Sequence, residues 1–247
     1  MSNTKSVLEA QLTPDDYRAS ATTQSLDALA GVIDRVDLGG MDAETVCDVG
    51  CGYGGLGLGI AAVAGAKEVI GVDIDTERLR VAGDRGMQVH EVNIETQPLP
   101  MADDSVDIIL SFGMIEHLRT YDNLLAEMHR VLRPDGCYVL GFPNLGSWLN
   151  RINLLRGYQP RDVEVSQEFP VGYAPGYPLN NTLNHLHSAT DHCMRALLDA
   201  HALDVAVSAP AFPYQQGVPL RIIDAVASLH PPLARRLLYA GTPSDRS

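Results

Sequence analysis

Short apolar runs alternate with helical patterns along the middle of this 247-residue chain, and this alternation constrains its fold more than any other feature. Strands are predicted, in order, at Thr45–Val49, Glu68–Asp73, Gln88–Val92, Val106–Ser111 and Cys137–Phe142. Helices are predicted between them at Leu56–Ala64, Thr76–Arg85 and Tyr121–Leu132, the last stopped by Pro134-Asp135-Gly136. The strands are rich in Val, Ile and Leu without clean alternation, which is typical of strands buried on both faces. The pattern therefore predicts an α/β fold, with a doubly wound, mostly parallel sheet and helices on both faces.

Less regular segments flank this region. Apolar residues recur at helical spacing between Thr13 and Val36, so we expect residues 1–40 to form an N-terminal helical cap and residues 41–247 the main domain. Residues around 144–184 combine a helix near Trp148–Leu155 with many prolines and glycines, and long irregular segments of this kind are usually functional. The last predicted elements are a helix capped by Thr190 and running to Ala200, a strand at Leu203–Ser208, a helix near Leu220–Leu229 and an apolar run at Leu237–Ala240.

The charge balance narrows the range of partners. With 18 basic against 31 acidic side chains, the formal charge is -13, which repels phosphate backbones and anionic lipid. Met1–Asp16 contains no apolar core run, and no stretch approaches the roughly 18 uninterrupted apolar residues of a membrane span. We therefore expect a cytoplasmic protein that binds neither nucleic acid nor membrane.

The sequence gives little evidence for a disulfide bond or a metal site. The four cysteines form no CxxC pair, so we expect them to be buried thiols: Cys47, Cys51, Cys137 and Cys193. The densest group of metal-ligand residues is His185 and His187 with Asp191 and His192, and it matches no strong spacing motif. We predict no metal site.

A glycine-rich turn follows the first predicted strand and opens a helix. Its glycines allow a tight turn and close approach of a ligand to helix N-terminal amides, but Gly50, Gly52 and Gly55 also fit the dinucleotide fingerprint. Asp48 lies two residues before Gly50, where a carboxylate crowds a pyrophosphate but can help hold a cationic amino acid. Asp73 ends the next strand and suits two ribose hydroxyls, a feature shared with nicotinamide-binding proteins.

Three further blocks have no counterpart in dehydrogenases: Leu99–Asp107, Ser111–Leu118 and Arg130–Gly136. With the glycine turn, they resemble the class I S-adenosylmethionine-dependent methyltransferases over Thr45–Phe142. The segments Phe142–Arg151 and Leu186–Leu203 are similar to the MetW-like subgroup, but Tyr158–Asn181 and the C-terminal helix depart from it, so that subgroup's role is not transferred. The resemblance implies a seven-stranded, Rossmann-like sheet and S-adenosylmethionine as cofactor, with S-adenosylhomocysteine as product.

The resemblance also implies a set of cofactor-binding residues. Asp48, Gly50, Cys51 and Gly52, with Tyr53, surround the methionine moiety; Asp73 binds the ribose; Ile74 stacks on adenine; Asn93 and Ile94 meet its edge; and Ser111 and Phe112 close the pocket through main-chain contacts. Plain core packing is the alternative for Ile74 and Phe112, and a solvated carboxylate is the alternative for Asp48 and Asp73.

Methyl transfer from a sulfonium requires alignment and exclusion of water, whereas a base is needed only for some acceptors. His117 is a candidate base after the fourth strand, and a helix cap is its alternative. His185 and His187 alternate on a possible strand, so both are expected to point to one side, toward the acceptor or toward solvent. Tyr173 and Tyr177 are candidates for lining the acceptor site, with a surface loop as the alternative.

Three functions are weighed against one another. The first is transfer of a methyl group to a small-molecule acceptor by direct displacement. The second is a protein of the same fold that binds the cofactor and regulates a partner enzyme. A nicotinamide oxidoreductase is nearly excluded for the short-chain type, because neither lysine lies four residues after a tyrosine. The sequence identifies neither the acceptor atom nor the oligomeric state.

Overall fold

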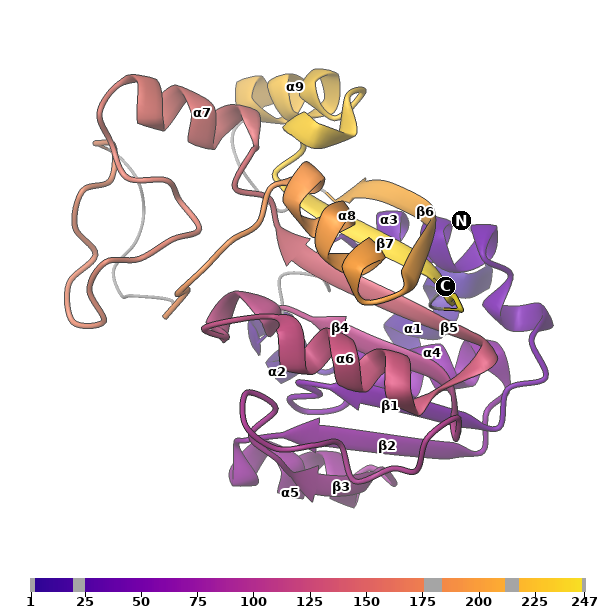
Figure 1. Ribbon diagram of the computed structural model, residues 1–247. Helices are drawn as coiled ribbons and strands as arrows, with labels where there is room; N and C mark the ends of the chain where they lie inside the picture. The colour runs from indigo at the N-terminus through magenta and orange to yellow at the C-terminus, as the bar shows by residue number, and fades with distance from the viewer. Residues whose placement is uncertain (1–2, 20–24, 176–183, 212–217, 246–247) are drawn as a thin grey trace.

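The computed structural model describes residues 3–19, 25–175, 184–211 and 218–245, which contain a seven-stranded sheet (Figure 1). Its strands are β1 (Thr45–Val49), β2 (Glu68–Asp73), β3 (Gln88–Glu91), β4 (Val106–Phe112), β5 (Leu132–Pro143), β6 (Leu203–Ala211) and β7 (Arg236–Pro243). They lie in the order β3-β2-β1-β4-β5-β7-β6. β7 runs antiparallel to β5 and β6, and the pairs among β1 to β5 are parallel. The predicted mostly parallel α/β sheet is confirmed.

Helices cover both faces of the sheet. The helices are α1 (Asn3–Ala10), α2 (Pro14–Ala19), α3 (Leu26–Arg35), α4 (Gly55–Ala64), α5 (Thr76–Asp84), α6 (Asp122–Val131), α7 (Trp148–Leu155), α8 (Asp191–Ala200) and α9 (Val218–Ala227), with short 3-10 turns at η2 (Leu38–Gly40), η3 (Ile115–His117) and η4 (Pro231–Leu233). Figure 1 shows α6 and α8 in front of the sheet and α1, α3 and α4 behind it. None of the helices in these described ranges is long and apolar enough to cross a bilayer.

Each central strand supplies side chains to two hydrophobic cores. In β4, Ile108 and Leu110 join the core under α1, α3 and α4, whereas Ile109 joins the core under α6 and α8. All seven residues of β4 are buried. This double burial explains why the strands are continuously apolar, since alternate residues face opposite cores.

The first helix, α1, lies in the predicted N-terminal cap but ahead of the helical spacing noted between Thr13 and Val36. Its one fully buried residue, Leu8, packs against α4 where a glycine leaves room. A Cβ atom on Gly59 would lie 3.1 Å from Leu8 Cδ2 and 3.3 Å from its Cα. A single leucine makes no sequence pattern, so the contact emerges only when the two helices meet.

The segment Pro134–Gly136 belongs to the start of β5 rather than to a separate turn. Register jumps from the pair Val106–Leu132 to the pair Ile108–Cys137, so four residues of β5 oppose Asp107 alone. The prediction that these residues only stop the preceding helix was therefore incomplete. A bulge of this kind holds proline and glycine without breaking the following ladder.

Candidate functional site

The glycine turn after β1 has a backbone that only glycine adopts easily. Gly50 has φ 79° and its amide donates to the Val72 carbonyl at 2.7 Å, which joins the turn to β2. A Cβ on Gly50 would lie 2.6 Å from the Cβ of Met114, so a side chain is excluded by space as well as by φ. The turn is thus pressed between β2 and the segment after β4.

Asp48 is the penultimate residue of β1, just before this turn, and is only 3% exposed. Burial raises the pKa of its carboxyl to about 7; the nearby Asp73 carboxylate adds to the rise, and a hydrogen bond from the Gly57 amide opposes it. An ionised carboxylate at this depth is unfavourable without a positive charge beside it. The position therefore favours a cationic ligand.

Asp73 ends β2 with its carboxylate fixed by three backbone amides. Oδ2 accepts from the Gly52 amide at 2.9 Å, and Oδ1 accepts from the amides of Ile74 at 2.7 Å and Asp75 at 3.0 Å. The carboxylate is thereby held in one orientation at the rim of a cavity, with capacity to accept further hydrogen bonds.

Two cavities within the described residues meet at Gly50, at the carboxyl ends of the parallel strands. The smaller, of about 60 Å³, is lined by Asp16, Asp48, Gly50, Cys51, Gly52, Tyr53, Leu56, Arg78, Phe112 and Gly113. The larger, of about 180 Å³, is lined by Val49, Gly50, Val72, Asp73, Ile74, Val92, Asn93, Ile94, Glu95, Met114, His117 and Leu118. Ten of the eleven residues implied as cofactor contacts line one or both cavities, and Ser111 lines neither.

Ile74, Phe112 and Ser111 differ sharply in their surroundings. Ile74 is 64% exposed although it is a large aliphatic residue, so the alternative that it packs in the core is wrong. Its side chain instead lies at the rim of the larger cavity. Phe112 both lines the smaller cavity and packs in the core, because Gly141 lets its ring approach the next strand. Ser111 is wholly buried, and its hydroxyl has no hydrogen-bond partner in the part of the chain that is described.

The loop after β3 lines one side of the larger cavity and is hydrogen-bonded to α6. Asn123 donates its side-chain amide to the carbonyls of Ile94 at 2.6 Å and Gln97 at 3.1 Å. Within the loop, Asn93 Oδ1 accepts from the Glu95 amide at 3.1 Å. This wall therefore depends on a helix nearly thirty residues further along the chain.

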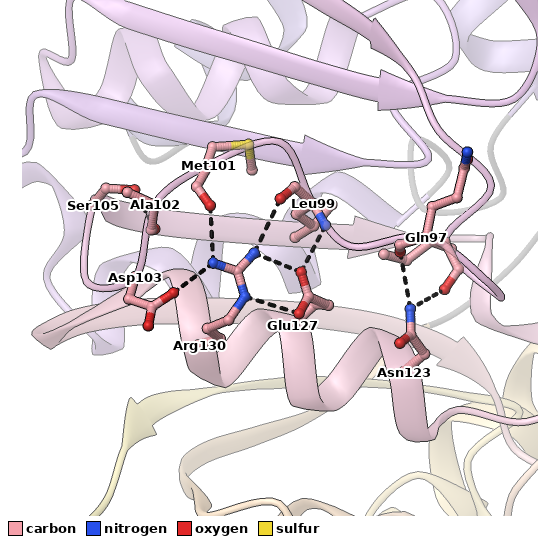
Figure 2. Close-up of polar contacts among 10 residues, drawn as sticks. Gln97, Leu99, Met101, Ala102, Asp103, Ser105, Asn123, Glu127 and Arg130 are labelled. Atoms are coloured by element: carbon pink, nitrogen blue, oxygen red, sulfur yellow. Dashed lines mark hydrogen bonds and ion pairs between the residues drawn. The ribbon is translucent and has the colours of Figure 1, made fainter.

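Arg130, also on α6, holds the rest of the same loop, as Figure 2 shows. It donates to the carbonyls of Leu99 at 3.0 Å and Met101 at 2.9 Å and forms ion pairs with Asp103 and Glu127. One planar guanidinium thus donates hydrogen bonds to two backbone carbonyls and two carboxylates at once, because its five N–H groups point in fixed, diverging directions.

Asp16, on α2, was missed by sequence reasoning. It lines the smaller cavity, accepts from the Gly55 amide at 2.9 Å at the start of α4, and pairs with Arg85 at 3.1 Å. Its own local signal is a capping box, because Thr13 and Asp16 exchange hydrogen bonds between side chain and backbone. That signal predicts the start of α2 but not its contact with the glycine turn.

The histidines lie close together but in different environments. His117 is exposed and lines the larger cavity, and its Nδ1 lies 3.0 Å from the carbonyl oxygen of Asn184. Because a carbonyl only accepts, Nδ1 carries the proton and Nε2 of the neutral ring is an acceptor. His185 is buried and its ring packs edge-on against His117, with centroids 5.0 Å apart. Burial lowers the pKa of His185.

The prediction that His185 and His187 point to one side was wrong. His185 is buried whereas His187 is exposed. The amides of Leu186 and His187 both donate to the Glu116 carbonyl, so this segment does not have the alternating geometry of a strand. His185 and His187 line neither of the two cavities.

The remaining candidates are placed as follows. Tyr173 is half-buried and lines neither cavity; burial raises its pKa to about 12, with smaller contributions from Glu164 and Asp162. Tyr177 lies outside the described residues. Three cysteines are buried as predicted, but Cys193 is exposed because it lies on the solvent side of the first turn of α8. Among the described residues no group of three metal-ligand side chains gathers.

Comparison with known proteins gives a consistent similarity. A family model described as a methyltransferase domain matches residues 47–140. The chain is 34% identical over 139 residues to dimethylglycine N-methyltransferase from Parasynechococcus marenigrum, covering 53% of this chain and 47% of that protein. It is 32% identical over 146 residues to a probable S-adenosylmethionine-dependent methyltransferase from Mycolicibacterium smegmatis, covering 58% of this chain and 56% of that protein. The chain thus spans about half the length of these relatives.

A solved structure shares the fold. The putative S-adenosylmethionine dependent methyltransferase from Listeria monocytogenes superposes with a TM-score of 0.60 at 16% identity, covering 87% of this chain and 98% of that one. Its similarity at this level concerns the arrangement of the sheet and helices.

Proposed function

We propose that this chain is, through its methyltransferase domain, a class I S-adenosylmethionine-dependent methyltransferase that transfers the donor's methyl group to a small-molecule acceptor by direct displacement. The observation that carries the proposal is the pair of adjoining cavities with an acid in each. Asp48 belongs to the smaller cavity and Asp73 to the larger, and Gly50 lies between them.

The residues present fit this donor. Asp73, fixed by three amides, is assigned to the ribose hydroxyls, and exposed Ile74 to the face of the adenine. Asn93 and Ile94 are assigned to the adenine edge. Asp48, with the backbone of Gly50, Cys51, Gly52 and Tyr53, is assigned to the cationic methionine moiety, because a buried carboxylate favours a positive charge. Phe112 closes the smaller cavity, and we propose no side-chain role for buried Ser111.

The donor supplies an activated methyl group, because its displacement releases a neutral thioether. The protein's own task is to hold the reactants in line and to keep water out. Where the acceptor must lose a proton, His117 is suited to take it, since the Asn184 carbonyl fixes the proton on Nδ1 and leaves Nε2 free to accept.

We propose the following organisation around this chemistry. Residues 1–40 form a cap whose Asp16 reaches the smaller cavity, and residues 41–247 form the methyltransferase domain. The irregular segment around 144–184 lies on the acceptor side. The formal charge of -13 supports a small-molecule acceptor over nucleic acid or an anionic membrane surface.

The proposal is tested by mass spectrometry after incubating the protein with donor labelled in its methyl group with deuterium. The acceptor mixtures are the small-molecule fraction of a cell extract and, because of the relative's name, dimethylglycine. A labelled small molecule is expected. Donor binding by titration calorimetry without any labelled product would instead support the alternative, a cofactor-binding protein that regulates a partner. Retention of a nicotinamide cofactor with no affinity for the sulfonium donor would contradict both.

A further inference from the structure

A buried polar cluster lies directly behind the His117 side of the larger cavity. It consists of Glu116 in η3, His185 in the segment before α8, and Arg236 at the start of β7. Their side chains come from three separate parts of the chain, and the residues are 2%, 9% and 7% exposed, respectively. Three ionisable residues rarely share a site this deeply buried without a function or a full set of partners.

The hydrogen bonding of this cluster is incomplete. Glu116 Oε1 lies 3.3 Å from Arg236 Nη2, so this ion pair uses only one of the two carboxylate oxygens. Glu116 Oε2 and His185 Nδ1 have no hydrogen-bond partner among the residues that the structure describes. Buried polar atoms are almost always paired with protein, water or ligand, so each of these two atoms calls for a partner.

Main-chain contacts hold the cluster in place and connect it to the cofactor cavity. The amides of Leu186 and His187 donate to the Glu116 carbonyl at 2.8 Å and 3.3 Å. The His185 ring packs edge-on against the ring of His117, which itself lines the larger cavity. The His185 ring is thus separated from the space assigned to the donor by one side chain, and Glu116 is the chain neighbour of that same His117.

From this arrangement we infer that Glu116 and His185 form the polar subsite for the methyl acceptor, and that the acceptor is an alcohol or an amine that carries an N–H group. The inference rests on the proposed function. A carboxylate oxygen needs a hydrogen-bond donor, which N–H and O–H groups supply and which a thioether or a carboxylate acceptor lacks. A carboxylate acceptor would also bring a second negative charge against Glu116.

Neutral His185 completes the recognition. Its lowered pKa, caused by burial, keeps the ring uncharged at neutral pH, although Glu116 and Asp162 oppose the shift and His117 and Arg236 reinforce it. Each nitrogen of an uncharged imidazole either donates or accepts one hydrogen bond. His185 Nδ1 can therefore form a second hydrogen bond to the same amine or hydroxyl group that donates to Glu116. Both residues are therefore assigned to acceptor binding. Because neither lines the two cavities, substituting them should leave donor binding unchanged.

The test compares Glu116→Gln and His185→Asn with His187→Asn, an exposed matched control on the same segment. The small-molecule fraction of a cell extract serves as the acceptor probe with deuterated-methyl donor. At limiting extract we expect about tenfold less labelled product from the first two variants, the size of one lost charge-assisted hydrogen bond. The loss should shrink at high extract, since it acts on acceptor binding. The control should keep the wild-type rate, and calorimetric affinity for S-adenosylhomocysteine should stay within about twofold for all three variants.

Several results would overturn the inference. These are wild-type product rates in both variants, a loss that does not change with extract concentration, or a label carried on sulfur or on a carboxylate. In each case donor binding and transfer by the wild type would leave the proposed function standing, whereas wild-type protein that fails to bind the donor would remove that function itself. Because Glu116→Gln weakens the ion pair with Arg236, thermal unfolding is measured for every variant. If that variant is unfolded, His185→Asn decides the outcome.

Discussion

At the scale of single residues, the site depends on two carboxylates at the ends of neighbouring strands. Asp48 is buried with a raised pKa, and Asp73 is held by three backbone amides. Identical side-chain chemistry thus serves two purposes, because burial sets the charge of one acid and hydrogen bonds set the orientation of the other. The two acids yield separate predictions.

Replacing Asp73 should weaken cofactor and product alike. We expect Asp73→Ala to lower the affinity for both S-adenosylmethionine and S-adenosylhomocysteine by about 2 kcal/mol, because the ribose is common to them. Titration calorimetry measures this. Asp75→Ala is the matched control: Asp75 caps α5 through the amides of Glu77 and Arg78 but lines neither cavity. It should cost about 1 kcal/mol of stability and no affinity. Unchanged affinity in Asp73→Ala would show the ribose assignment to be wrong.

Binding of the sulfonium donor should strengthen as pH rises through about 7, the pKa of Asp48. The cationic donor favours the ionised carboxylate, so its binding lowers that pKa and releases a proton near neutrality. Calorimetry at pH values about one unit either side of 7, in buffers of different ionisation enthalpy, measures both effects. The neutral thioether product should show a smaller dependence, and Asp48→Asn should flatten the profile for the donor. Equal donor affinity at both pH values in the wild type contradicts this assignment.

The same shift affects folding with a defined sign. The pKa of Asp48 in the folded state lies above its ordinary value of 3.8, so the native state binds more protons than the unfolded state between these values. Its contribution to stability therefore falls as pH rises from about 4 to about 7. Donor binding reverses part of this loss, because a positive charge beside Asp48 favours its ionised form.

At the scale of elements, α6 acts as the support for the loop that walls the larger cavity. Asn123 and Arg130 lie on one helix and bind five backbone or side-chain groups of residues 94–103 between them (Figure 2). This gives a physical reason for an arginine at the end of the helix that precedes β5. On the opposite side, Asp16 joins α2 to the start of α4.

Removing the Asn123 contacts should loosen the loop and weaken cofactor binding indirectly. Asn123→Ala leaves the carbonyls of Ile94 and Gln97 without this donor, and we expect a loss of about 1 kcal/mol in donor affinity. Asp122→Ala, an exposed change at the preceding position of α6, should have no such effect. Hydrogen exchange of residues 94–97 provides a second measurement. Equal affinity and equal exchange in the two variants would argue against the supporting role.

At the scale of the whole molecule, two cores on opposite faces of one sheet join the N-terminal helices to the rest of the protein. α1 contributes Leu8 to the core that also contains Leu29, Ile60 and Leu110. The cap is therefore continuous with the main core, and its packing should contribute to global stability.

Truncating Leu8 should destabilise the whole protein rather than the first helix alone. We expect Leu8→Ala to lower the free energy of unfolding by about 3 kcal/mol, because the residue is fully buried and Gly59 leaves no side chain to fill the gap. Chemical denaturation followed by circular dichroism measures the change. Ser6→Ala, an exposed change on the same helix, should stay within about 0.5 kcal/mol. A cap that unfolds separately would give a first transition at low denaturant and an unchanged main one.

The sequence by itself determined the order of strands and helices from Thr45 to Phe142, and its resemblance to the methyltransferase family implied the ten residues that line the two cavities. The order of the elements, the glycine turn and the acids at the ends of consecutive parallel strands depend on local rules of side-chain period and turn chemistry. Only the tertiary structure decided that Asp16 meets Gly55, that His185 is buried while His187 is exposed, and that Glu116 meets Arg236. The two contacts join residues that are 39 and 120 positions apart, and the burial of His185 depends on which main-chain groups meet. The periodicity of the local sequence contains no information about either.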